Sequence, residues 1–184
     1  MKNHQELIQS VANGDNHGFR VLYDQFCDKV YNTAISYVQS QQDAEEITQD
    51  VFTSVFRNAS KFKGDSALGT WIYRITVNTS INYINRKKRF SLLNFSNEEI
   101  EKPDFEHPGV LLEKRESAKI LFQVIDTLPD SQKTAFILSF VEELPRQEVA
   151  DIMEISLKAT ESLLQRAKNN LRNKLKNKYT DRRK

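Results

Sequence analysis

The residues best suited to chemistry lie in the last third of the chain, where one predicted helix carries two different faces. Thr160, Leu164, Ala167 and Leu171 recur at spacings of four, three and four residues, so they share the inward face of a helix running from about residue 157 toward residue 176. The outward face carries side chains that can hydrogen-bond bases or neutralise phosphates, namely Ser162, Gln165, Arg166 and Asn169. A polar, basic helix of this kind fits the major groove of duplex DNA. An ordinary helical hairpin with a solvated face is the alternative interpretation.

A short helix precedes this one and completes the pattern of a helix-turn-helix. Residues 144–153 predict a helix in which Pro145 falls in the first turn, where proline is tolerated. Residues 154–156 form the turn, and Ser156 is placed to cap the second helix. We therefore expect a DNA-binding helix-turn-helix near the C-terminus.

A second stretch, residues 62–89, has the composition of a surface for single-stranded nucleic acid. It interleaves aromatic, amide and hydroxyl side chains and ends in the basic cluster Arg86-Lys87-Lys88-Arg89. Unstacked bases need flat surfaces, polar groups for their edges and cations for the backbone. Taken alone, Trp71 is more typical of a core residue than of a stacking platform. Asn78, in the middle of a helix, is harder to explain as a core residue, because a buried amide needs partners.

Residues that could form an enzyme active site or a metal site do not gather in the sequence. His4, His17 and His107 fall in unrelated segments, and a single cysteine cannot anchor a structural zinc ion. The acidic cluster at residues 43–50 has no histidine beside it, so we interpret it as an exposed acidic face, which could also dock a basic partner. We expect no catalytic residues, no metal and no cofactor.

The composition favours a mostly helical protein, because 184 residues include only five glycines and four prolines. The net charge is only +2, but residues 166–184 hold nine basic side chains against one acidic one, which is typical of a segment near phosphates. The single cysteine, Cys27, indicates a reducing compartment, and its apolar neighbours predict a buried thiol. No apolar run exceeds four residues and the start lacks a signal-peptide core, so we expect a cytoplasmic protein with no membrane insertion.

Helical spacing organises the rest of the chain. We expect four helices before residue 90, at about residues 7–11, 17–38, 42–59 and 67–88, with enough apolar faces to close a small bundle. The acidic, proline-interrupted segment at 91–109 predicts a flexible linker, and helical periodicity resumes at Val110. The expected fold is therefore all-α, with one small domain at residues 1–90 and a second, containing the helix-turn-helix, at residues 110–184.

These motifs together resemble bacterial extracytoplasmic-function (ECF) sigma factors of the short, two-domain type. Residues 62–89, with Gly-Asp-Ser, Thr-Trp-Ile-Tyr-Arg-Ile and Asn78, are similar to the promoter-melting domain of that family. Residues 43–52 resemble its helix that docks on the polymerase clamp. The C-terminal half is similar in Leu128-Pro129, Glu148-Val149-Ala150 and Arg166-Ala167-Lys168, so the resemblance covers about residues 19–175.

The resemblance implies a non-enzymatic sigma subunit that directs promoter-specific transcription initiation. Its partners would be core RNA polymerase, through the clamp of the largest subunit and the flap region, together with promoter DNA and a candidate anti-sigma factor. The domain at residues 1–90 would bind core polymerase and melt the −10 element, and the domain at residues 110–184 would recognise the −35 duplex.

Three sets of contact residues are implied by the resemblance. An unstacked −10 base would be captured by the loop at residues 65–68 together with Asn78, residues 86–89 would hold phosphates, and Arg146 and Lys168 would anchor the −35 backbone. The implied contacts with core polymerase are Asp43, Glu46, Ile47, Asp50 and Phe52. The implied −10 contacts are Asp65, Ser66, Ala67, Leu68, Trp71, Arg74, Asn78, Arg86, Lys87, Lys88 and Arg89. The implied −35 contacts are Arg146, Lys158, Glu161, Ser162, Gln165, Arg166 and Lys168.

Some positions depart from the family pattern. Glu154 takes a turn position that is usually glycine. If the backbone is left-handed there, the glutamate lowers the stability of the fold by about 1 kcal/mol. Leu163 and Glu161 replace common basic residues, which predicts that the recognition helix binds DNA more weakly or with greater sequence specificity. Asn82 and Asn85 replace an aspartate and a basic residue. Three rival classes are a simple helix-turn-helix regulator, a sigma mimic that binds only an anti-sigma factor, and a helical adaptor. The first leaves residues 1–90 without a role, and the other two do not need the basic clusters.

Overall fold

The computed structural model describes residues 4–93 and 115–181, and every regular element in these ranges is a helix. The chain divides into two compact units, Met1–Asp104 and Phe105–Lys184. This confirms the expected all-α fold with two small helical domains. Helix α4 continues to Leu93, so the first three residues of the expected linker are helical, and residues 94–109 lie outside the described part of the chain.

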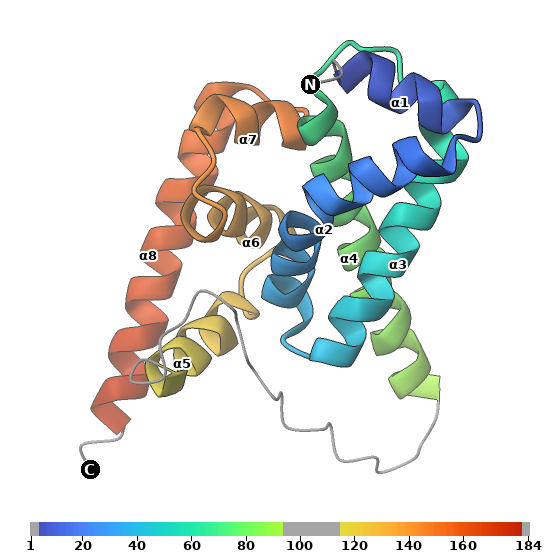
Figure 1. The fold of residues 1–184 in the computed structure, drawn as a ribbon. Helices are drawn as coiled ribbons and strands as arrows, with labels where there is room; N and C mark the ends of the chain where they lie inside the picture. Colours follow the sequence, from blue (N-terminus) through green and yellow to red (C-terminus); the bar gives the residue numbers. More distant parts are fainter. Residues whose placement is uncertain (1–3, 94–114, 182–184) are drawn as a thin grey trace. The chain divides into compact units, whose positions relative to one another are not determined.

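The first unit contains α1 (His4–Ala12), α2 (Asn16–Val38), α3 (Gln41–Asn58), a 3-10 turn η1 (Ala59–Lys61) and α4 (Leu68–Leu93). Helices α2, α3 and α4 pack against one another, and α1 lies across α2 and η1 (Figure 1). The side chain of Asp15 caps α2 by accepting the His17 N–H at 2.9 Å, and Ser40 Oγ caps α3 by accepting the Asp43 N–H at 3.3 Å. The first cap thus ends the turn between α1 and α2, and the second ends the two-residue turn, Gln39 and Ser40, after which α3 packs against α2.

The core of this unit follows the helical spacing of the sequence. Ile47, Val51 and Val55, spaced by four, are fully buried, as are Leu22 and Ile72 on the helices opposite. Hydroxyl groups inside the bundle bond back to carbonyl oxygens one turn earlier, at 2.7–2.9 Å, so that they are buried without losing a hydrogen bond. These hydroxyls belong to Thr33, Ser36, Thr48, Thr76 and Ser80. The thiol of Cys27 is only half-buried, so the expectation of a buried thiol is wrong; it lies on the edge of the α2 core face.

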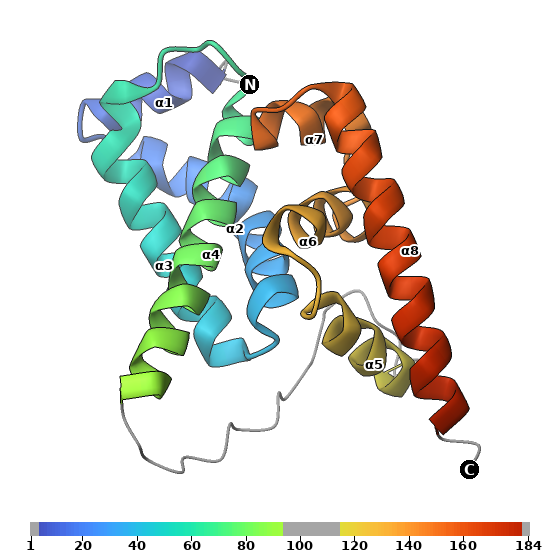
Figure 2. The same cartoon turned by 180° about the vertical axis from the view of Figure 1, so that it is seen from behind.

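The second unit contains α5 (Arg115–Ile125), α6 (Asp130–Phe136), a π-helical turn η3 (Ile137–Val141), α7 (Arg146–Met153) and α8 (Leu157–Asp181) (Figure 2). Helices α7 and α8 form the predicted helix-turn-helix, with α7 starting two residues later than expected. Glu154 adopts φ 56° and ψ 40°, so its backbone is left-handed, which is the condition under which glycine would be favoured at this position. Ser156 Oγ accepts the Ala159 N–H at 3.2 Å, which confirms Ser156 as the cap of α8.

Polar contacts fix α8 against the rest of the second unit. Its inward residues, Thr160, Leu164, Ala167 and Leu171, are buried as predicted. Asn170 Nδ2 donates to Gln132 Oε1 of α6 at 2.8 Å. Lys174 Nζ donates to the Thr127 carbonyl and hydroxyl oxygens at 3.0 and 2.6 Å. The rotation of α8 about its axis is thereby set, and with it the identity of the side chains on its outward face.

Candidate nucleic-acid interface

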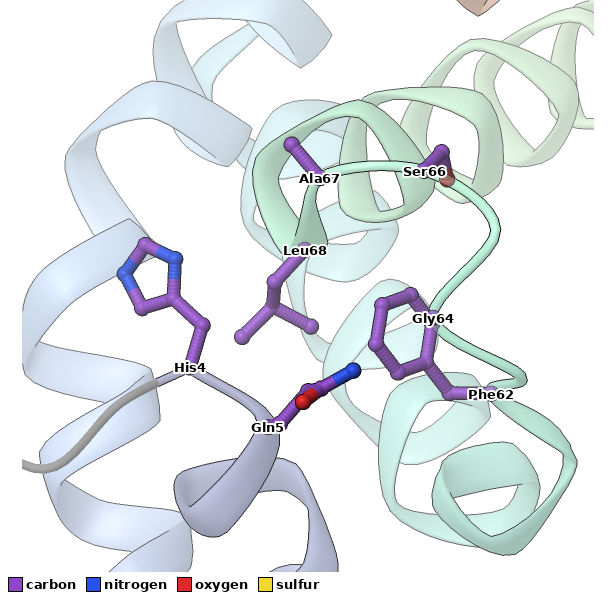
Figure 3. Close-up of a pocket in the computed structure, with 7 residues that line it drawn as sticks. All are labelled: His4, Gln5, Phe62, Gly64, Ser66, Ala67 and Leu68. Carbon is purple, nitrogen blue, oxygen red and sulfur yellow. The ribbon is translucent and has the colours of Figure 1, made fainter.

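A small pocket lies under the loop that leads into α4 (Figure 3). Its volume is about 200 Å³, and the buried side chain of Leu68 lies in the middle of the residues that line it. The Phe62 ring forms one wall and packs on Trp71 with ring centroids 5.3 Å apart. Gly64, at φ +78°, allows the loop to turn. The full lining is His4, Gln5, Phe62, Gly64, Ser66, Ala67 and Leu68. We call it the loop pocket.

The predicted −10 residues take different positions around this pocket. Asp65 and Ala67 are exposed at the loop, and Ser66 is half-buried. Leu68 is buried and forms part of the pocket's apolar lining. Half-buried Trp71 does not line the pocket but supports the Phe62 wall, so its position fits a core role.

Asn78 lies away from the loop pocket and is exposed on α4. Ten residues of continuous helix separate it from Leu68, which places it about 15 Å along the helix axis at 1.5 Å per residue. A single unstacked base cannot span that distance. The structure therefore separates the two groups that the sequence led us to assign to one base, and Arg74, half-buried, falls between them.

The end of α4 is tied to the acidic start of α3 by a cluster of polar contacts. Lys87 Nζ lies 2.7 Å from Asp43 Oδ2, and Arg86 Nη2 lies 3.3 Å from Glu46 Oε1. Between them, Tyr83 Oη donates to Asp43 Oδ1 at 2.8 Å and is 3.1 Å from Glu46 Oε2, with the Arg86 guanidinium 5.2 Å from the Tyr83 ring centroid. Partial burial, and then the hydrogen bond to Asp43, raise the pKa of Tyr83, so its hydroxyl keeps its proton and remains a donor. We call these five residues the α3–α4 charge cluster.

Of the other predicted polymerase contacts, one is exposed and two are buried. Asp50 is exposed on α3. Ile47 is 0% exposed and Phe52 3% exposed, and both belong to the core of the first unit. Their side chains are committed to the unit's own packing, so only the acidic members of the predicted set present surface to a partner. The basic residues Lys88 and Arg89 are exposed beyond the charge cluster.

The predicted −35 residues gather on one exposed surface of the second unit. Lys158, Ser162 and Gln165 occupy the solvent face of α8, opposite its buried stripe. Arg166 is exposed on one side of that face, with its Nε 3.3 Å from the Ser162 carbonyl oxygen.

Glu161 and Lys168 lie on the other flank of α8. Arg146 Nη1, from the start of α7, is 3.5 Å from Glu161 Oε1. Lys168 Nζ lies 4.5 Å from the ring centroid of Phe140. The structure thus brings together all seven residues predicted to contact the −35 duplex, and three of the cations, Arg146, Arg166 and Lys168, already have partners within the protein.

Known proteins match this chain along both units. Residues 22–90 match Sigma-70 region 2, and residues 118–171 match Sigma-70, region 4. The ECF RNA polymerase sigma-E factor of Haemophilus influenzae is 32% identical over 183 residues, covering 93% of this chain and 94% of that one. The chain belongs to the ECF RNA polymerase sigma factors. The sigma-E factor of Escherichia coli strain K12 is likewise 32% identical to this sigma factor, over 180 residues that cover 93% of each chain.

Two solved structures share the fold of this sigma factor. CnrH, in complex with the cytosolic domain of CnrY, is 18% identical with a TM-score of 0.68, covering 94% of this chain and 96% of that one. The sigma factor RpoE, in complex with the anti-sigma factor NepR from Bartonella quintana, is 20% identical with a TM-score of 0.62, covering 86% of this chain and 96% of that one.

Several residues that help to form the surfaces of this sigma factor were not predicted from the sequence. His4 and Gln5 line the loop pocket from α1, nearly sixty residues away in the sequence, and no motif links them to the loop. Phe140 holds Lys168 through a contact that depends on the path of η3. Tyr83 could have been predicted from the sequence as a neighbour of Arg86 and Lys87, because it lies one turn before them on the same helix face. The described residues contain no group of acidic, cysteine or histidine side chains that could hold a metal ion, and none of their helices is long and apolar enough to cross a membrane.

Proposed function

We propose that this chain binds core RNA polymerase and directs it to promoters through three surfaces. The outward face of α8 would read the −35 duplex, the loop pocket and α4 would capture melted −10 DNA, and the acidic face of α3 would dock on the polymerase clamp. The observation that carries the proposal is the division of α8, whose inward stripe is buried while its predicted contact side chains face solvent. That arrangement is what a major-groove recognition helix requires.

Promoter melting would be driven by base capture rather than by covalent chemistry. The loop pocket, at about 200 Å³, has room for one ring system, which a base would offer only after leaving the double-helical stack, so binding there would favour the melted state. Lys88 and Arg89, exposed at the end of α4, would attract the phosphates of the opened strand. The chain would supply binding energy and placement and have no enzymatic activity of its own, acting in the cytoplasm.

The division of labour follows the two units. We assign polymerase docking and −10 recognition to the first unit and −35 recognition to the second. An anti-sigma factor is a proposed further partner, in analogy with RpoE, whose solved complex contains the anti-sigma factor NepR.

Reconstitution with core polymerase tests the proposal directly. The full chain should co-elute with core polymerase in gel filtration and should then produce discrete run-off transcripts from fragmented genomic DNA. Core polymerase alone should not give these transcripts. A helix-turn-helix regulator would bind duplex DNA without co-eluting, and a sigma mimic would do neither, so either result would overturn the proposal.

A further inference from the structure

The first turn of α1 forms part of the loop pocket, although it precedes the loop by nearly sixty residues. Gln5 reaches from α1 toward the loop, and its amide group points to Gly64 and the Phe62 ring (Figure 3). A Cβ atom added to Gly64 would lie only 2.8 Å from Gln5 Nε2, which shows how closely the amide approaches the loop. The pocket is therefore built from two separate parts of the sequence.

Helix α1 is held in place by residues other than Gln5. Leu7, Ile8 and Val11 are buried in the core of the first unit. His4 Nε2 lies 3.0 Å from Gln25 Nε2, and its ring lies 6.1 Å from the Phe26 ring. Gln5 itself is exposed, and within the described part of the chain its amide has no hydrogen-bond partner. The helix thus positions an amide whose donor and acceptor are available at the pocket.

The size and lining of the pocket indicate what it can hold. A volume of about 200 Å³ is below the range of roughly 300–1,000 Å³ for pockets that take drug-sized ligands, so it fits one planar ring system. Phe62, which is half-buried, offers apolar surface to the face of a ring, and the buried side chain of Leu68 completes the apolar part of the lining. Gln5 and Ser66 offer an amide and a hydroxyl to its edge, and an amide can present a donor and an acceptor together.

We propose that Gln5 determines base specificity in the loop pocket, by hydrogen-bonding the edge of one unstacked base of the −10 non-template strand. The base rests against Phe62, and the amide from α1 selects which base is accepted. This inference rests on the proposed function, since it assumes that the loop pocket captures promoter DNA. It adds the N-terminal helix to the surfaces that set promoter choice.

A selection with the complete holoenzyme tests the role of Gln5. The probe is a pool of pre-melted bubble templates, identical except for randomised bases in the non-template strand of the −10 region, and transcribed templates are sequenced. Gln5→Ala should reduce the preference at one position by roughly fivefold or more, as expected for the loss of one base-edge contact. The control is Gln9→Ala, the same residue type one turn further along α1 and outside the pocket lining, which should keep the wild-type preference.

A matched pair of glycine variants tests the same contact from the loop side. Gly64 and Gly14 have φ values of +78° and +81°, so alanine introduces similar backbone strain at both. Only at Gly64 does the new Cβ atom meet Gln5, because nothing lies within 4 Å of a Cβ at Gly14. Gly64→Ala should alter the preference at the position that responds to Gln5→Ala, and Gly14→Ala should not.

The outcomes separate this inference from the proposed function. If the wild-type holoenzyme selects bubble templates but Gln5→Ala keeps an identical preference profile, the role of Gln5 is overturned and the proposed function stands. A uniform loss of transcription with an unchanged profile also overturns it, because that result indicates a structural role. If the wild-type chain initiates on none of the templates, the proposed function fails and this inference fails with it.

Discussion

Lys87 Nζ at the end of α4 lies 2.7 Å from Asp43 Oδ2 at the start of α3, so a cation expected to meet DNA is paired with an anion expected to meet polymerase. Arg86 and Glu46 repeat the relationship at 3.3 Å. In the free protein, part of each predicted surface therefore neutralises the other. Polymerase binding to the acids would release the basic side chains to contact DNA.

Asp43→Asn should increase the nonspecific DNA affinity of the free chain, because it removes the anion that neutralises Lys87. The affinity should also fall more steeply with salt, since one more cation then displaces counterions from the duplex. Stability should fall by about 1 kcal/mol, because Asp43 is only 14% exposed and also accepts the Tyr83 hydroxyl, for which asparagine keeps an acceptor oxygen. Fluorescence anisotropy with a labelled duplex over a salt series measures the effect. Asp50→Asn, on the same helix but outside the charge cluster, is the control, and equal responses from the two variants would contradict the masking of Lys87.

Replacing Glu46 and Asp50 together with lysine should weaken binding to core polymerase by roughly tenfold or more, because like charges would then meet a basic clamp surface. Both side chains lie off the buried stripe of α3, so the helix content should be unchanged in circular dichroism. A charge-matched control replaces Asp24 and Asp28 on the solvent face of α2 with lysine. Normal core affinity in the Glu46 and Asp50 variant at moderate salt would exclude the α3 surface as the dock.

Asn78→Ala should reduce open-complex formation while leaving binding to the −35 duplex intact. Asn78 is exposed on α4, about 15 Å from the loop pocket, so its loss should not disturb the preference set within that pocket. Permanganate reactivity of unpaired thymines measures melting, and a pre-melted template should restore much of the activity. An equal defect on duplex and pre-melted templates would show that Asn78 does not stabilise the melted strand.

Gln165→Ala and Arg166→Ala should have different effects on −35 recognition. Gln165 is exposed on the outward face of α8, where its amide can read a base, and its loss should relax preference at one position by about 1–3 kcal/mol. Arg166, on the edge of that face, should contact a phosphate. Its loss should therefore weaken binding to all promoters similarly and reduce the salt dependence of that binding. Binding selection on randomised −35 duplexes distinguishes the two. An unaltered profile for Gln165→Ala would remove that residue from base readout.

Glu154→Gly should give a more stable protein than Glu154→Ala, by about 1 kcal/mol, because only glycine adopts a left-handed backbone without strain. Both variants remove the Glu154 side chain, so the difference between them isolates the backbone conformation at φ 56°. Urea unfolding of the full chain, followed by circular dichroism, provides the measurement. Equal stabilities would mean that the turn of the helix-turn-helix relaxes to accept a β-carbon.

Helix registers and caps could be predicted from the sequence because they depend on neighbours within a few residues. The spacing of Ile47, Val51 and Val55 identified a core stripe, and Ser156 was placed correctly as a cap. The same periodicity could not identify the π-helical turn at residues 137–141, where the Glu142 N–H donates to the Ile137 carbonyl oxygen at 3.0 Å. The apolar pattern of residues 136–141 is the same in an α-helix and a π-turn.

Contacts between distant helices were beyond the reach of the sequence. The pairing of Lys87 with Asp43 depends on how α4 packs against α3, and the approach of Gln5 to Gly64 depends on the position of α1. Phe52 was expected to contact polymerase, yet the packing of α3 against α2 buries it beside Tyr23, with ring centroids 4.5 Å apart. Placing such side chains requires the tertiary structure.

The contact between Lys168 and Phe140 has a consequence for the entropy of DNA binding. A free lysine side chain loses up to about 2 kcal/mol of rotamer freedom when it is immobilised. The Phe140 ring, 42% exposed and 4.5 Å from Lys168 Nζ, already restricts that side chain in the protein without DNA. If Lys168 binds a phosphate as predicted, part of its ordering would be complete before DNA arrives. An aromatic residue on η3 would then raise the affinity of α8 for DNA by restricting the rotamers of a neighbouring lysine.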